Sequence, residues 1–263
     1  MNGAITYNTK DLQTYDPATR VGIITNEINH TDVPEQVGEL MALADANGSV
    51  LADITYPSRL ITIAGSIHGS SQADLDNRID EFKGYFIGKN KDLDIAYGGS
   101  TRRYTATKNS LSITRQQKAL FATYSLEFIC TDPFGRDITT TVLVDEVGYT
   151  SASITAPVVV SGSAPYQLPI ITITINGLTG EGDYLQLSSD VTGQEMLLAG
   201  LGLEDGDVVI INTETKKVTV SAIEVDYNGT FIELEPGAQS LTITDGFDTR
   251  DVDILIEYYK RYM

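Results

Sequence analysis

The chain has 263 residues, of which 36 are acidic and 18 basic, so its formal net charge is −18 at pH 7. This excess of acid repels phosphates and anionic lipids, which disfavours tight binding to nucleic acid or to a membrane surface. The single Cys130 excludes an internal disulfide, and two histidines with one cysteine exclude a Cys/His zinc site.

The order of apolar residues argues against targeting to a membrane. No apolar run approaches the ~20 residues that cross a bilayer. The first 16 residues also lack the basic-then-apolar order of a secretory signal. We therefore expect a soluble protein that is not exported by that route and makes no contact with a membrane.

The first part of the chain predicts several strands and two helices. A period of two over residues 122–130 places Tyr124, Leu126 and Phe128 on one face of a strand. Residues 73–86 carry apolar side chains at helical spacing, with Ser70 or Ser71 available as the cap. Residues 34–44 also read as a helix. Further strands are predicted at residues 60–63, 93–97, 104–107 and 111–114.

A segment rich in small residues and proline, 151–166, predicts a linker between two domains, 1–150 and 167–263. Beyond it, short alternating segments are separated by glycine-containing turns, the pattern of an antiparallel sandwich. The expected strands cover residues 171–175, 184–187, 208–211, 217–220, 230–234, 241–243 and 252–258. The chain is therefore expected to be mainly β.

A nucleophilic site is only weakly suggested. Ser66 and His68 would share one face of a strand, but the spacing matches no nucleophile elbow, and such a pair is more often part of the scaffold. His30 reads as a loop residue. The glycines at 200, 202 and 206 resemble a dinucleotide fingerprint only superficially, and a turn before the next strand explains them better.

Pairs of acidic residues are too common to indicate catalysis. They occur at Asp74 and Asp76, Asp92 and Asp94, and within residues 204–207 and 248–253. A carboxylate dyad of a hydrolase would have this form, but solvated faces and turns have it more often. No pattern of metal ligands or cofactor-binding residues accompanies them, so we expect no metal, no cofactor and no catalytic residue.

A group of basic residues stands out in this acidic chain. Its members are Arg102, Arg103, Lys108, Arg115 and Lys118. They would pair either with an acidic edge of a neighbouring copy or with acids of the same chain, and the sequence favours neither alternative.

Several short motifs follow one another in a fixed order. In the first domain these are residues 59–67 (RLITIAGSI), 75–82 (LDNRIDEF), 93–99 (LDIAYGG), 103–107 (RYTAT), 111–115 (LSITR) and 128–134 (FICTDPF). In the second they are residues 169–173 (PIITI), 206–207 (GD), 227–231 (YNGTF), 235–237 (EPG), 241–243 (LTI) and 256–262 (IEYYKRY). This order resembles the distal tail protein (Dit) family of long, non-contractile phage tails.

The resemblance implies a structural virion protein rather than an enzyme. Its first domain would be a tail-tube-like β-sandwich or barrel with one flanking α-helix. This domain would form a hexameric ring around a channel for DNA. The second would be a galectin-like or carbohydrate-module-like β-sandwich at the periphery. The implied partners are further copies of the chain, the tail tube protein, a tail-tip or tail-associated protein and a receptor-binding protein, in a virion tail assembled in the host cytoplasm.

A second interpretation assigns the C-terminal sandwich to glycan binding. Sugars stack on aromatic rings, and this chain has no tryptophan. The candidates are Tyr184, Tyr227, Phe231 and Tyr258, some of which must belong to the core.

Overall fold

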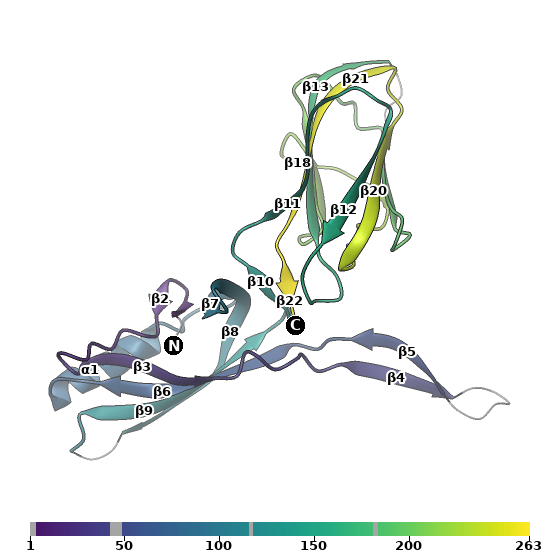
Figure 1. Ribbon diagram of the computed structural model, residues 1–263. Coiled ribbons are helices and arrows are strands. Elements are labelled where there is room, and N and C mark those ends of the chain that lie inside the picture. The colour runs from purple at the N-terminus through teal and green to yellow at the C-terminus, as the bar shows by residue number, and fades with distance from the viewer. Residues whose placement is uncertain (1–3, 43–48, 116–117, 181–183) are drawn as a thin grey trace. The chain divides into compact units, whose positions relative to one another are not determined.

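The computed structural model describes residues 4–42, 49–115, 118–180 and 184–263 (Figure 1). Contacts between Cα atoms divide the chain into a first unit, Met1–Ile138 with Met263, and a second unit, Thr139–Tyr262. The described residues are mainly β, with α1 as the one helix among them. The fold class expected from the sequence is confirmed.

The first unit is a rolled antiparallel sheet with a helix and a separate hairpin. The order of hydrogen-bonded strands is β2-β1-β7-β8-β9-β6-β3, and β10 also pairs with β8. The elements of this unit are β1 (Ile5–Tyr7), β2 (Lys10–Asp11), β3 (Gly22–Ile28), β4 (Val37–Ala42), β5 (Ser49–Thr55), β6 (Arg59–His68), α1 (Gln72–Gly84), β7 (Lys91–Tyr97), β8 (Ser100–Arg115), β9 (Phe121–Cys130) and β10 (Gly135–Asp137).

The two ends of this strand order meet along a seam. Tyr15 N–H donates to the Ile23 carbonyl at 3.0 Å, and Thr25 N–H donates to Gln13 Oε1 at 2.8 Å. Gly22 permits the approach, because its φ is +123° and a Cβ there would lie 2.5 Å from the Thr14 carbonyl oxygen. The sheet therefore closes toward a barrel along the first half of β3.

Helix α1 forms where its apolar period predicts. Ser71 caps it, its hydroxyl accepting a hydrogen bond from Asp74 N–H at 3.1 Å, and Asp74 and Lys83 complement the helix dipole at the two ends. Its buried face is Leu75, Ile79 and Phe82. This face joins the apolar core of the rolled sheet, where aromatic side chains pack edge to face or tilted: Tyr7, Phe82, Phe86, Tyr124 and Phe128.

The helix expected over residues 34–44 is wrong for the described part of that segment. Val37–Ala42 is β4, which pairs with β5 as a two-stranded hairpin of its own. Figure 1 shows this hairpin running on from β3 and β6 as a separate projection. We call the paired strands β4 and β5 the arm. Residues 104–107 and 111–114, expected as two strands, belong to the single long strand β8.

The second unit is a β-sandwich. Its sheets have the orders β11-β21-β13-β16-β17-β18 and β12-β20-β14-β15-β19, and their inner faces share one apolar core. The strands of the sandwich are β11 (Thr141–Tyr149), β12 (Ser153–Val160), β13 (Pro169–Thr179), β14 (Tyr184–Ser189), β15 (Glu195–Ala199), β16 (Val208–Asn212), β17 (Lys217–Val220), β18 (Ile223–Glu224), β19 (Asn228–Gly229), β20 (Gly237–Asp245) and β21 (Thr249–Tyr258). The short β22 (Arg261–Tyr262) follows them and belongs to neither sheet of the sandwich.

Two segments of the second unit differ from the sequence expectation. Residues 230–234 are not a strand: they are irregular, with one bridge between Leu234 and Gln167. Strand β12 lies within residues 151–166, expected as a linker, and β11 lies before them, although both pair with strands of the second unit. Pro157 fits there because β12 is an edge strand. At an edge, the N–H that proline lacks is not needed for the hydrogen bonds to the inner neighbour.

Candidate functional site

The suggested nucleophilic pair is in contact but lacks an orienting group. Ser66 Oγ and His68 Nε2 lie 2.8 Å apart on β6, as their shared strand face predicts. Burial lowers the pKa of His68. In the described part of the chain no carboxylate hydrogen-bonds to His68, whose ring instead packs near Tyr15 and Phe121. A hydrolytic triad needs that third group, so the pair fits a role in the scaffold.

The acidic pairs of the first unit bind arginines of the same chain. Asp94 Oδ1 lies 2.7 Å from Arg103 Nε, and Asp92 Oδ2 lies 3.1 Å from Arg103 Nη1. Asp76 pairs with Arg115, which also donates to Gln72. For Arg103 and Arg115 the intrachain alternative therefore holds.

The glycine-containing segment before β16 is a turn. Gly206 N–H donates to the Ile175 carbonyl at 2.7 Å, and Asp207 accepts hydrogen bonds from Glu204 N–H and the Ser221 hydroxyl. These bonds lower the pKa of Asp207. An ionised carboxylate at this position disfavours a bound phosphate.

The described residues contain neither a cluster of metal ligands nor a membrane-spanning helix. No group of three or more His, Cys, Asp or Glu side chains is arranged to hold a metal ion in residues 4–42, 49–115, 118–180 and 184–263. Among the helices described there, none is long and apolar enough to cross a membrane.

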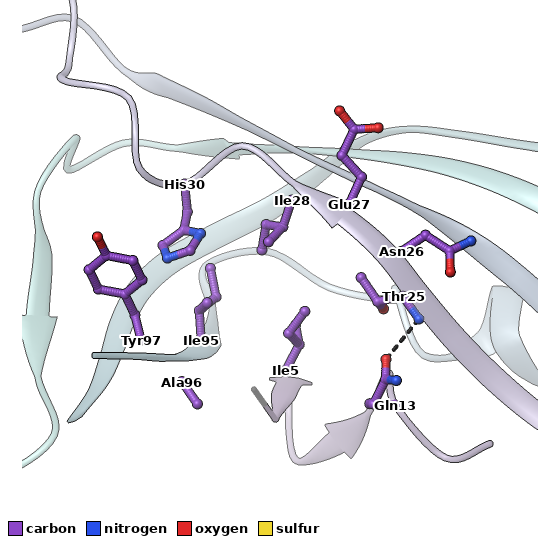
Figure 2. A pocket seen from close by; sticks show the side chains of 10 residues that line it. All are labelled: Ile5, Gln13, Thr25, Asn26, Glu27, Ile28, His30, Ile95, Ala96 and Tyr97. Carbon is purple, nitrogen blue, oxygen red and sulfur yellow. Dashed lines mark hydrogen bonds between the residues drawn. The ribbon is translucent and has the colours of Figure 1, made fainter. Parts of the chain in front are cut away.

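An open groove of about 410 Å³ lies between β3 and the ends of β1 and β7, where the two edges of the seam separate (Figure 2). The register of β3 against β6 shifts between Thr25 and Glu27, a β-bulge that bends the strand. Beyond the bulge, β3 faces the ends of β1 and β7 across the groove. The walls combine apolar side chains, Ile5, Ile28, Ile95 and Ala96, with the polar Gln13, Asn26 and Glu27.

His30 lies at this groove and is buried, although the sequence suggested only a loop residue. It is 5% exposed, and neither ring nitrogen has a hydrogen-bond partner. Figure 2 shows its ring beside Tyr97, and the two ring centroids are 5.0 Å apart. Desolvation lowers the pKa of His30, and the charges of Arg102 and Arg59 lower it further. The imidazole is therefore held in its neutral form.

Arg59 is buried next to His30 and is held by backbone carbonyls. Its guanidinium donates to the carbonyls of His30, Asp32 and Pro133, and it lies 5.6 Å from the Tyr104 ring centroid. Among the described residues no carboxylate lies within ion-pair distance of it. These bonds fix the backbone where the chain leaves β3 for the arm, a role that sequence reasoning missed because burial depends on distant contacts.

The arm exposes apolar side chains. Val37, Met41, Leu51 and Ile54 are each about half exposed, from 48% to 58%. A lone two-stranded hairpin is marginally stable in water, and contiguous exposed apolar surface marks sites of association. The arm is therefore the clearest candidate for contact with another chain.

The aromatic candidates for glycan binding are divided by burial. Tyr258 is fully buried in the core, and its hydroxyl bonds to the Ser161 backbone. Tyr184 and Tyr227 are partly exposed, and Tyr227 packs edge to face with Phe231, with ring centroids 4.8 Å apart. A shallow groove of about 230 Å³ is lined by Gln186, Glu195, Leu197, Asn228 and Gly229, the last two of which directly follow Tyr227 in the chain.

Each unit matches a domain family of phage tail proteins. Residues 10–130 match the phage tail protein RIFT-related domain, and residues 161–262 match the siphovirus-type tail component, C-terminal domain. No curated protein sequence matches the chain.

Two solved structures share the fold over nearly the whole chain. The crystal structure of SPP1 Dit (gp 19.1), described as a paradigm of the hub adsorption apparatus of phages infecting Gram-positive bacteria, aligns with a TM-score of 0.72 at 14% identity, covering 99% of each chain. A chain of the phage P2 baseplate in its activated conformation with Ca aligns with a TM-score of 0.50 at 11% identity, covering 98% of this chain and 97% of that one.

Proposed function

Because the chain belongs to the distal tail protein family of siphophages, we propose that it forms a ring of six copies that joins the tail tube to the tail tip and leaves a channel for DNA. The observation that carries this proposal is the presence of both family domains, in order, over most of the chain. Its role is that of a structural component of the phage tail.

The arm supports self-association. Its exposed apolar side chains belong to a hairpin that pairs with no other strand of the described residues. Burying half-exposed aliphatic side chains stabilises an interface by about 25 cal/mol per Å² of apolar area removed from water. A ring gives each copy a neighbour that can bury this surface.

Net charge supports the channel. Six copies would carry six times the charge of −18, and acids lining the inner wall would repel passing DNA. DNA would then traverse the ring without binding to it. A basic inner wall in an imaged ring would contradict this part of the proposal.

The test is to image the full chain at high concentration by negative-stain electron microscopy, with light scattering on the same sample to count subunits. We expect six-fold rings with an open centre, alone or after addition of the tail tube protein. The tail-tip and receptor-binding proteins are the further partners to add. Compact monomers under all these conditions would refute the proposed role.

A second proposal is glycan binding by the C-terminal sandwich. The observation that favours it is the groove lined by Gln186, Glu195 and Asn228, which directly follows the exposed Tyr227 in the chain, since amide and carboxylate groups near an aromatic ring suit a sugar. Glycan-array binding that is lost in Tyr227→Ala would support it. An array without signal would remove it.

A further inference from the structure

The second half of β8 has one unpaired edge. Residues 100–106 of β8 pair with β7, and residues 106–115 pair with β9 on the other side. From Lys108 to Arg115 no described strand occupies the edge that β7 leaves. Such an edge presents N–H and C=O groups on which another chain can add a strand.

A groove of about 470 Å³ lies at this edge, on the side of α1. Its lining includes the half-buried Leu111 and Ile113, together with Ser110, Lys83 and Lys108. The register of β8 against β9 shifts between Lys108 and Ser110, a bulge that interrupts the regular ladder. Farther along β8, Arg115 bonds to Asp76 and Gln72 of α1. Helix and strand edge thus enclose an apolar floor.

Two lysines make this groove cationic. Lys108 is exposed and has no ion pair among the described residues, and Lys83 has only an exposed pair with Asp80 at 2.9 Å. An exposed pair of this kind contributes little, so Lys83 can turn to another carboxylate at small cost. The groove combines aliphatic side chains with positive charge in a protein that carries −18 overall.

The arm has the complementary composition. Strands β4 and β5 contain two acids, Glu39 and Asp53, and neither lysine nor arginine, and Glu39 is exposed on β4. Met41 and Leu51 add exposed apolar surface on the same hairpin. Two copies of a strongly acidic chain repel each other, so contact between them requires local opposite charge. The groove beside β8 supplies it.

The groove at the seam does not have this property. Its lining includes the carboxylate of Glu27 and neither lysine nor arginine. The two arginines near its histidine are already engaged, Arg59 by three backbone carbonyls and Arg102 by the ring of Tyr97. An acidic hairpin would meet a carboxylate there. Charge therefore favours the groove beside β8.

We propose that the groove between α1 and the free edge of β8 receives the β4–β5 arm of a second copy of this chain, one arm strand pairing with residues 108–115. The arm and the groove are different surfaces, so the contact is head to tail and closes into a ring at the right rotation. This inference rests on the proposed function and names the surfaces that would join neighbours in the ring.

Disulfide trapping tests the pairing directly, even where association is weak. One full-length chain carries Met41→Cys in the arm and another carries Ser110→Cys in the groove. Burial raises the pKa of Cys130 to about 12, so the native thiol does not compete. We expect several-fold more disulfide-linked dimer from this pair than from Met41→Cys with Ser153→Cys on the exposed edge of the second unit. Equal yields would overturn the proposal.

Charge reversal tests the chemistry. We expect the double variant Lys83→Glu with Lys108→Glu to abolish ring formation. The matched double variant Lys83→Arg with Lys108→Arg should still form rings. Adding Glu39→Lys to the chain with the reversed groove should restore part of the ring formation. Ring association of the native chain should also weaken with added salt. Intact rings from the reversed groove would overturn the proposal while leaving the proposed function standing.

Mixing distinguishes a head-to-tail contact from a symmetric one. A chain with Met41→Asp and Leu51→Asp keeps only its groove, and the chain with the reversed groove keeps only its arm. The mixture should give one-to-one dimers that grow no further, because one competent contact remains. If instead the native chain never forms rings, the proposed function fails, and the disulfide yields still decide whether the arm meets the groove.

Discussion

Among the described residues each unit buries one arginine, and the two differ in what surrounds the charge. Arg250 of the second unit lies 2.7 Å from Asp245 in an ion pair that is nearly enclosed on both sides. Arg59 of the first unit has three carbonyl partners and no carboxylate. One charge is neutralised inside the sandwich, whereas the other is held by backbone groups at the root of the arm.

The difference indicates what each unit is built to do. The bonds of Arg250 join Asp245 to the carbonyls of Thr150 and Phe247, all within one sandwich. Arg59 instead fixes the segment between β3 and the arm, whose own strands bury little. In the first unit the buried cation thus positions the arm, whereas in the second unit it stabilises contacts within the sandwich itself.

The largest effect is expected from Arg250→Met. The change leaves Asp245 as a buried carboxylate without its partner, which typically destabilises a protein by about 3–5 kcal/mol. Urea denaturation, with hydrogen exchange of core amides in β13 and β21, should show the loss in the second unit. Adding Asp245→Asn should recover part of it, because the amide oxygen can still accept from Phe247 N–H. A double variant no more stable than the single one would contradict this account.

A smaller and more local effect is expected from Arg59→Met. The methionine fills much of the same volume, but three carbonyls lose a charged donor, which we expect to cost about 2–3 kcal/mol. The amides of residues 30–33, 35 and 36 should lose protection from hydrogen exchange, and this segment should become a site of proteolysis. Arg250→Met is the matched control and should leave these amides unchanged. Equal protection in both variants would show that Arg59 does not hold the arm.

Sequence reasoning succeeded where a buried face imposes a period. Leu75, Ile79 and Phe82 gave α1, and the alternation of β9 gave its inner face, because both patterns report a core within the same chain. The contact of Ser66 with His68 followed from strand geometry in the same way.

The same reasoning failed on the arm. The apolar residues of 34–44 have helical spacing, yet Val37 and Met41 are exposed on a strand. Periodicity predicts structure only when the apolar face packs inside its own chain, and the arm has no such core. The burial of His30 and Arg59 was also beyond reach, since it depends on β7 and β8, which lie far away in sequence.

A third prediction concerns pH and the buried His30. Its pKa is lowered in the folded chain. As the pH falls from about 7.5 to 5.5, the unfolded chain therefore binds a proton at this residue while the folded chain does not. Stability should therefore fall as pH falls, by at most about 1.4 kcal/mol per pH unit for one group. His30→Leu should remove more of this slope than His68→Gln, and the double variant should remove most of it. Unfolding midpoints that are constant over this range would contradict the prediction.

The smallest effect is expected at the exposed cations, which sharpen the contrast between buried and solvated charge. Lys217 pairs with Glu224 at 2.8 Å on the surface of the second unit, with more than half of each side chain exposed. Solvent and salt screen such a pair, so Lys217→Met should change the free energy of unfolding by less than about 0.5 kcal/mol. Arg103→Met in the first unit should cost about 1 kcal/mol, since Arg103 binds both Asp92 and Asp94 and is only 30% exposed. Urea denaturation at low and at high salt measures both losses of stability. If Lys217→Met and Arg103→Met lose the same free energy of unfolding, burial does not set the strength of these pairs.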